Sequence, residues 1–105
     1  MVSRKKIHDA VELLRQAADP RKIILFGSYA RGEPADDSDV DLLVVEDRVD
    51  DVAAEMVRLM RILSPLRIPA EVLVIGLADF ERWSTAPGSV YRDAAEHGEV
   101  LYDAA

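Results

Sequence analysis

The chain has 105 residues, half of them apolar, which suits one modest hydrophobic core and indicates a single domain over residues 1–105. Its formal charge of −7 disfavours direct binding to nucleic acid, because an acidic surface repels phosphate backbones. The absence of cysteine excludes disulfides and thiolate metal sites, and no apolar run reaches the roughly 20 residues that span a bilayer. We therefore expect a cytoplasmic protein with no membrane partner.

Apolar residues recur at helical spacing in two long segments, residues 3 to 18 and residues 50 to 63. Ser3 is a candidate N-cap for the first of them. The second predicts an apolar face made of Val52, Met56, Leu59, Met60 and Leu63. Two shorter helices are expected at residues 78 to 83 and 89 to 97.

Three β-prone runs alternate with these helices, at residues 22 to 26, 39 to 46 and 70 to 76. Residues 28 to 32 are expected to form one helical turn, and residues 100 to 102 are expected to be extended. The connection between the first two strands is too short for a crossover helix, so these strands are predicted to be antiparallel. The pattern predicts an α/β (α+β) fold in which helices flank a small mixed β-sheet.

Three carboxylates, Asp39, Asp41 and Glu71, each stand at the start of an otherwise apolar β-run. Residues i and i+2 of a strand share a face, so Asp39 and Asp41 point the same way with Cα atoms about 7 Å apart. Glu71 joins them if the third strand pairs with the second. Such a cluster of negative charge implies a compensating cation, Mg²⁺ or Mn²⁺. The alternative is that Asp39 is a turn residue and Glu71 a surface charge.

Gly27 and Ser28 follow the first strand and offer backbone N–H groups and a hydroxyl to an anion. Phosphate is the natural anion beside a metal, although an ordinary turn is the alternative. A Walker phosphate loop is excluded, because Glu33 and Pro34 replace its lysine and hydroxyl residue. An EF-hand loop is excluded by Leu42 at its glycine position.

Together, the segments Gly27-Ser28-Tyr29-Ala30-Arg31-Gly32-Glu33 and Ser38-Asp39-Val40-Asp41-Leu42-Leu43-Val44 closely resemble the signature of the DNA polymerase β-like nucleotidyltransferase superfamily. The short length and the Ala-Arg-Gly-Glu continuation resemble the minimal nucleotidyltransferases (MNT), which are often encoded beside HEPN-domain proteins. The resemblance implies the nucleotidyltransferase fold and nucleotidyl transfer as the reaction.

The resemblance also implies roles for individual residues. Gly27 is the close-approach glycine and Ser28 a ligand of the triphosphate. Asp39 and Asp41 become catalytic metal ligands. Glu71 falls at the third carboxylate, where it holds the metal or activates the acceptor hydroxyl. This position is often Asp in the family, and Glu is one methylene longer. Arg31 is a candidate donor to the phosphates.

Proteins of this MNT kind are antitoxins that neutralise a HEPN ribonuclease toxin, and some transfer AMP from ATP to a tyrosine of that toxin. The resemblance therefore predicts ATP as the nucleotide donor, Mg²⁺ or Mn²⁺ as the cofactor and a HEPN toxin as the partner. Two alternatives stay open. One is a nucleotidyltransferase that acts on a small-molecule hydroxyl, and the other is a non-catalytic antitoxin that blocks its toxin sterically.

Overall fold

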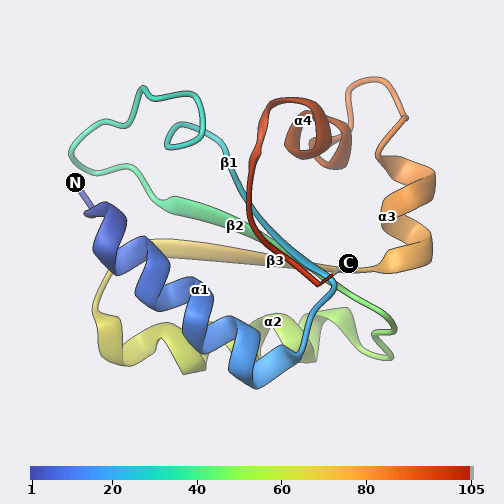
Figure 1. Cartoon of the computed structure of the whole chain (residues 1–105), viewed down its shortest axis with the longest axis horizontal. Helices are drawn as coiled ribbons and strands as arrows, with labels where there is room; N and C mark the ends of the chain where they lie inside the picture. Colours follow the sequence, from blue (N-terminus) through green and yellow to red (C-terminus); the bar gives the residue numbers. More distant parts are fainter. Residues whose placement is uncertain (105) are drawn as a thin grey trace.

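The computed structural model describes residues 1–104 and contains a four-stranded β-sheet (Figure 1). The strands lie in the order β3-β2-β1-β4. Strand β1 is antiparallel to both of its neighbours, whereas β2 and β3 are parallel. The strands span Lys22–Phe26 (β1), Val40–Glu46 (β2), Ala70–Gly76 (β3) and Glu99–Asp103 (β4). The predicted mixed sheet and its antiparallel first pair are confirmed.

Two long helices cover one face of the sheet, α1 at Arg4–Ala18 and α2 at Val52–Leu63, and the 3-10 helix η1 at Ser64–Leu66 follows α2 (Figure 1). The Ser3 hydroxyl caps α1 by accepting a hydrogen bond of 3.2 Å from the Lys6 N–H, as predicted. The helices and strands share a core that includes Ile7, Leu14, Ile23, Leu25, Leu42, Val44, Leu59 and Val72.

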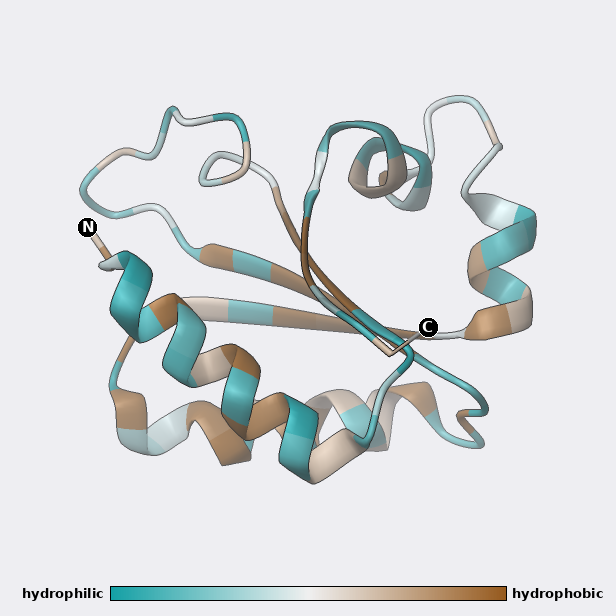
Figure 2. Ribbon diagram, in the orientation of Figure 1, coloured by the Kyte–Doolittle hydropathy of each residue, from teal (hydrophilic) through white to brown (hydrophobic). Residues whose placement is uncertain are grey.

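Two shorter helices, α3 at Leu77–Trp83 and α4 at Val90–His97, pack on the opposite face. Phe80 and Ala94 are their buried residues, and they form a second core with Ile24, Phe26, Leu43, Val45 and Ile75. Successive residues of a strand point to opposite faces, so a sheet covered on both sides needs continuous apolar runs. Figure 2 shows such runs in brown along the central strands.

Two local predictions are confirmed, and the structure extends the second of them. Residues 28 to 32 form a single helical turn, in which the Arg31 N–H bonds the Gly27 carbonyl at 3.1 Å, and the turn ends at Gly32, which has φ +73° and whose N–H bonds the Tyr29 carbonyl at 3.3 Å. The extended segment at residues 100 to 102 belongs to a fourth strand, β4, which pairs with β1. Its partner lies at the other end of the chain, so local sequence patterns carry no signal for the pairing.

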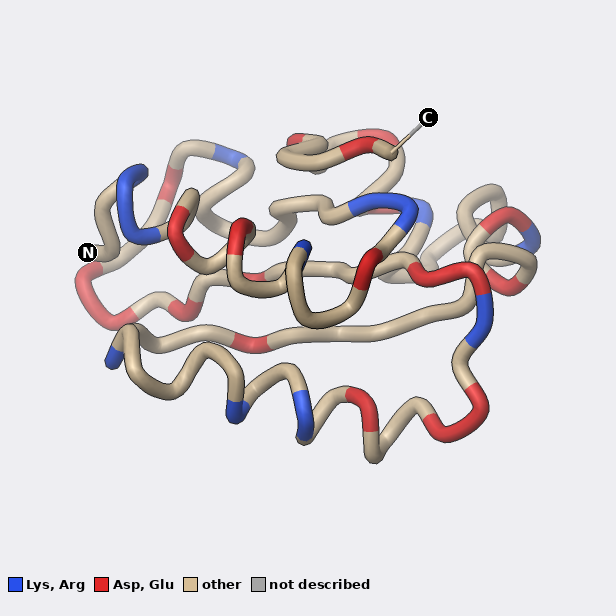
Figure 3. Tube along the Cα trace, turned by 60° about the horizontal axis from the view of Figure 1, so that its bottom comes forward, with Lys and Arg blue, Asp and Glu red and all other residues tan. Residues whose placement is uncertain are grey.

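The predicted apolar face of α2 is only partly buried. Leu59 and Leu63 are buried, but Val52 and Met60 are 42% and 40% exposed. The helix packs mainly against β3 and α1, which leaves much of its circumference open. Figure 3 shows how charged residues are distributed along this helix and the loops beside it.

The sequence predicted no segment that spans a membrane. Within residues 1–104, no helix is both long and apolar enough to cross a bilayer.

Gly98 joins α4 to β4 at a crowded point, and it gives the first testable prediction. A β-carbon there would press against the Ala94 carbonyl, 2.6 Å from Ile24 Cγ2 and 2.9 Å from the Leu25 carbonyl oxygen. Gly98→Ala should therefore destabilise the fold by about 1–3 kcal/mol in urea unfolding. Gly76→Ala is the matched control, because Gly76 has a similar backbone conformation and its β-carbon would meet only the Val49 nitrogen, at 4.0 Å. Equal effects of the two substitutions would contradict the steric argument.

A second prediction concerns Glu46, whose Oε2 is buried at the end of β2 without a hydrogen-bond partner. Burial and the neighbouring Glu55 carboxylate raise the pKa of Glu46 to about 8. Because the pKa of Glu46 is higher in the folded chain than its ordinary value of 4.5, the contribution of this group to the free energy of unfolding is fully present below pH 4.5. That contribution is lost as the pH rises through about 8. Glu46→Gln should therefore stabilise the protein at pH 9, by on the order of 1 kcal/mol or less because solvent screens this group.

Urea unfolding at pH 5 and pH 9 checks this prediction. The Arg58 guanidinium holds the pKa of Glu55 at about 2, so Glu55 contributes stability that disappears only as the pH falls below its usual range. The two effects therefore lie in different pH windows. A Glu46→Gln variant that is less stable than the parent at pH 9 would show that the carboxylate is favourable there.

Candidate active site

Three neighbouring strands place Phe26, Asp41 and Glu71 in one row across the sheet. Asp41 of β2 is the register partner of Phe26 of β1 and of Glu71 of β3. Side chains at directly paired positions share a face, and this row lies on the face that carries Ile24 and Leu43. The sequence predicted that Glu71 joins the aspartates if the third strand pairs with the second. The two strands do pair, and Glu71 lies beside Asp41.

The beginning of β2 separates polar from apolar side chains. Val40 is fully buried on the α1/α2 face, and its N–H starts the ladder to β3 with a 2.8 Å bond to the Pro69 carbonyl. Asp39 and Asp41 therefore point to the other face, where Asp41 is half-buried and Asp39 is exposed. The buried valine fixes the direction in which both carboxylates point.

The carboxylates influence one another electrostatically. Burial is the main reason why the pKa of Asp41 lies above its usual value. The negative charges of Glu71 and Asp39 raise this pKa further, and the positive charge of Arg31 lowers it. Asp41 therefore lies in the field of two other negative charges, those of Glu71 and Asp39. A cation bound between these groups would offset their repulsion.

The donor set fits Mg²⁺, a hard cation that prefers oxygen ligands. Among residues 1–104, no group of three acidic, histidine or cysteine side chains is arranged so that it could hold a metal ion by itself. Mg²⁺ is usually held by one or two carboxylates and completes its shell with phosphate oxygens and water. Asp39 and Asp41 therefore suit a metal that arrives with a nucleotide, and Glu71 stands at the side of this pair.

The Gly27 turn lies directly against the Asp41 carboxylate. Gly27 has φ +73°, and a β-carbon there would overlap the Asp41 carboxylate and lie 3.2 Å from its Cγ. The turn uses the N–H groups of Arg31 and Glu33 for bonds to the carbonyls of Gly27 and Ser28 at 3.1 and 3.0 Å. Within residues 1–104, the N–H groups of residues 28 to 30 have no such partner, so they can donate to an anion beside the carboxylates.

Tyr29 is a positioning residue that the sequence alone did not reveal. Its hydroxyl accepts a 2.8 Å hydrogen bond from the Val2 N–H, and its side chain packs against the α1/α2 core. The Gly27–Ser28 turn is thereby tied to the N-terminal segment. A tyrosine within a polar loop is a weak signal, because its partner lies in another part of the sequence.

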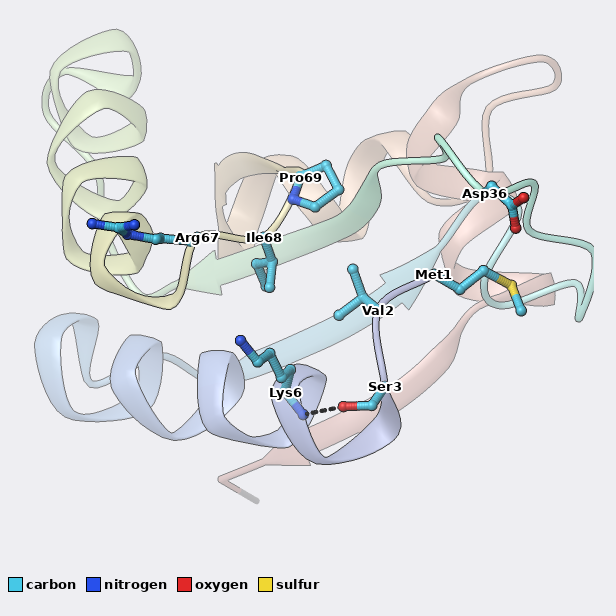
Figure 4. A pocket seen from close by; sticks show the side chains of 8 residues that line it. All are labelled: Met1, Val2, Ser3, Lys6, Asp36, Arg67, Ile68 and Pro69. Carbon is cyan, nitrogen blue, oxygen red and sulfur yellow. Dashed lines mark hydrogen bonds between the residues drawn. The ribbon is translucent and has the colours of Figure 1, made fainter.

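A cavity of about 310 Å³ lies near this loop, but none of the three carboxylates lines it. Figure 4 shows its walls, which come from the N-terminal segment, from Asp36 and from Arg67–Pro69. Lys6 reaches across this region and donates a 3.3 Å hydrogen bond to the Leu66 carbonyl. The carboxylate row is therefore an open surface site and is separate from this cavity.

An open row of carboxylates beside a turn with free amides is the arrangement expected of an enzyme that binds a metal–nucleotide complex. Comparison with known proteins agrees. A family model described as "Polymerase beta, Nucleotidyltransferase" matches residues 8–105. The chain therefore belongs to the polymerase beta nucleotidyltransferase family, and the predicted enzyme class is confirmed.

Two relatives illustrate the similarity. "Putative protein adenylyltransferase MJ0604" of Methanocaldococcus jannaschii is 32% identical over 106 residues, which cover 97% of this chain and 100% of that protein. The crystal structure of "a putative nucleotidyltransferase from Sulfolobus solfataricus" superposes with a TM-score of 0.63 at 20% identity, covering 95% of this chain and 79% of the other. The nucleotidyltransferase fold is thus confirmed, while the roles of individual site residues stay predictions.

The contact between Gly27 and Asp41 gives a third prediction. The sequence predicts that this site binds an ATP–Mg²⁺ complex, and on that prediction Gly27→Ala should weaken the binding by roughly 100-fold, because the new methyl group displaces the Asp41 carboxylate. Gly32→Ala is a matched control, since Gly32 also has φ +73° but its β-carbon would meet nothing within 4 Å. Titration calorimetry measures both affinities. A loss of the same size in both variants would attribute the effect to backbone strain alone.

Proposed function

We propose that the protein transfers AMP from ATP to a tyrosine hydroxyl of a partner HEPN ribonuclease toxin, and so acts as its antitoxin. The observation that carries the nucleotidyl-transfer part is the register of Asp41 with Glu71 beside the Gly27 turn. The name of the M. jannaschii relative supports a protein acceptor. The HEPN partner and the tyrosine rest on the MNT resemblance.

In this proposal, Asp39 and Asp41 hold Mg²⁺, which neutralises phosphate charge and polarises the α-phosphorus. The amides of the Gly27–Ser28 turn and the Ser28 hydroxyl bind the triphosphate oxygens. Arg31 adds positive charge beside Asp41, in agreement with its effect on the pKa of that group. These residues orient the α-phosphate beside the Gly27 turn, at the end of the sheet where β2 and β3 begin.

The reaction joins the acceptor oxygen to the α-phosphorus and breaks the bond from that phosphorus to the pyrophosphate oxygen. The hydroxyl proton must leave as the new bond forms, and Glu71 is the base that the row provides beside the metal ligands. Glu71 is exposed on the strand at the edge of the sheet, so an acceptor from another protein can reach it. The alternative role of Glu71 is to complete the metal site.

The fourth prediction tests the reaction directly. Purified protein, Mg²⁺ and the candidate HEPN protein are incubated with ATP labelled at either the α- or the γ-phosphate. Only the α-label should appear on the partner, because AMP is transferred and pyrophosphate leaves. Asp39→Asn/Asp41→Asn should reduce the labelling by at least about 1,000-fold, as expected when the groups that hold a catalytic metal are lost.

The matched control is Asp36→Asn/Asp37→Asn, which removes the same charge from the loop that precedes β2 but leaves the carboxylate row intact. It should retain labelling. Labelling of a small hydroxyl compound instead of the protein would support the small-molecule alternative. A tight complex that inhibits the toxin without any labelling would support steric neutralisation and refute transfer.

A further inference from the structure

The outer side of α2 is apolar where a surface helix is normally polar. Its charged residues are Glu55, Arg58 and Arg61, and the other side chains of the helix are apolar. Only Leu59 and Leu63 are buried. By contrast, the exposed residues of α1 between Lys5 and Gln16 are charged or polar. A helix that is apolar on nearly all sides is normally covered on all of them.

The exposed apolar residues of α2 form a stripe. Ala53, Val57 and Met60 are spaced by four and three residues, so they lie along one side of the helix. Val57 and Met60 are 51% and 40% exposed. Ser64 continues this line at the end of the helix. Because Ala53 and Ser64 are small, another chain can approach the backbone of α2 closely at both ends of the stripe.

The ends of α2 carry opposite charges. Asp50 and Asp51 are exposed at the N-terminal end and line a hollow there with the cations Arg48 and Arg58, of which Arg58 is paired with Glu55. Arg61 and Arg67 are exposed at the C-terminal end, and neither forms an ion pair with any residue between 1 and 104. Figure 3 shows this polarity, with blue toward one end of the helix and red toward the other.

We propose that the stripe formed by Ala53, Val57 and Met60 is the interface between two copies of this chain, which pair their α2 helices antiparallel about a twofold axis. That arrangement sets the acidic end of each helix against the basic end of the other, so every favourable charge contact occurs twice. The helix dipoles are then antiparallel as well. A parallel pairing would place like charges together at both ends.

The pairing leaves the candidate active site free. Helix α2 and the carboxylate row lie on opposite faces of the sheet, because α2 packs with Val40 and Val72 whereas Asp41 shares its face with Leu43. Two copies joined through α2 would therefore present their carboxylate rows on opposite sides. The inference does not depend on nucleotidyl transfer.

The fifth prediction is a concentration-dependent mass. A single helix pair is a small interface, so sedimentation equilibrium should show the mass rising from 11.6 kDa toward twice that value with concentration. The shift should be weaker at high salt because the charges are exposed. Val57→Glu should weaken the association at least about tenfold. Val100→Glu is the matched control, since Val100 is 50% exposed on β4, and it should leave the association unchanged.

Charge reversal tests the antiparallel arrangement. Asp50→Lys and Arg67→Asp should each weaken self-association, because each places like charges together at both ends of the helix pair. Aspartate is chosen at position 67 because the residue there has φ +53°, which aspartate tolerates better than most residues. An equimolar mixture of the two variants should associate again, since both end contacts are then between opposite charges.

Three outcomes would overturn the inference: a mass of 11.6 kDa at all concentrations, an equal effect of Val57→Glu and Val100→Glu, or no association in the mixture of charge variants. Far-ultraviolet circular dichroism of each variant confirms that it is folded. Failure of the nucleotide-transfer experiment would leave these results untouched, so the two proposals are separable.

Discussion

The parallel ladder between β2 and β3 is the constraint on which the candidate site depends. Its first bond, from the Val40 N–H to the Pro69 carbonyl, sets Asp41 opposite Glu71. A slip of one residue would turn Glu71 toward the α1/α2 core, where no buried residue between 1 and 104 is polar or charged and could pair with it. The apolar residues Val72 and Val74 resist that slip, because it would remove them from the α1/α2 core. Hydrophobic burial therefore holds the mutually repelling carboxylates together.

The two cores have different relations to the site. The α1/α2 core is the larger of the two and lies on the face of the sheet opposite the carboxylates. It supports the site through the buried Val40 and through the Tyr29 side chain. The α3/α4 core lies on the same face as the carboxylates, and it begins two residues further along β2, at Leu43. Substitutions in the first core should act on the site by shifting its supports.

The sequence predicted most elements because their signals are local. The Ser3 cap, the continuous apolar run of β1 and the i, i+2 spacing of Asp39 and Asp41 each depend on neighbours in the chain. Features that depend on distant partners could not be predicted in this way, such as β4, the hydrogen bond of Tyr29 and the raised pKa of Glu46. The partial exposure of α2 was missed because apolar periodicity locates a helix but does not state how much of its circumference is covered.

The sheet order also bears on how the protein emerges from the ribosome. Strand β1 is central and its residues Ile23–Phe26 are buried, yet one of its two edges is covered only by β4, at the far end of the chain. While the nascent chain is still incomplete, that edge presents unpaired backbone groups between apolar faces. Such an edge is a template for association with other strands. Pairing of β4 with β1 therefore protects the chain from such association as well as completing its sheet.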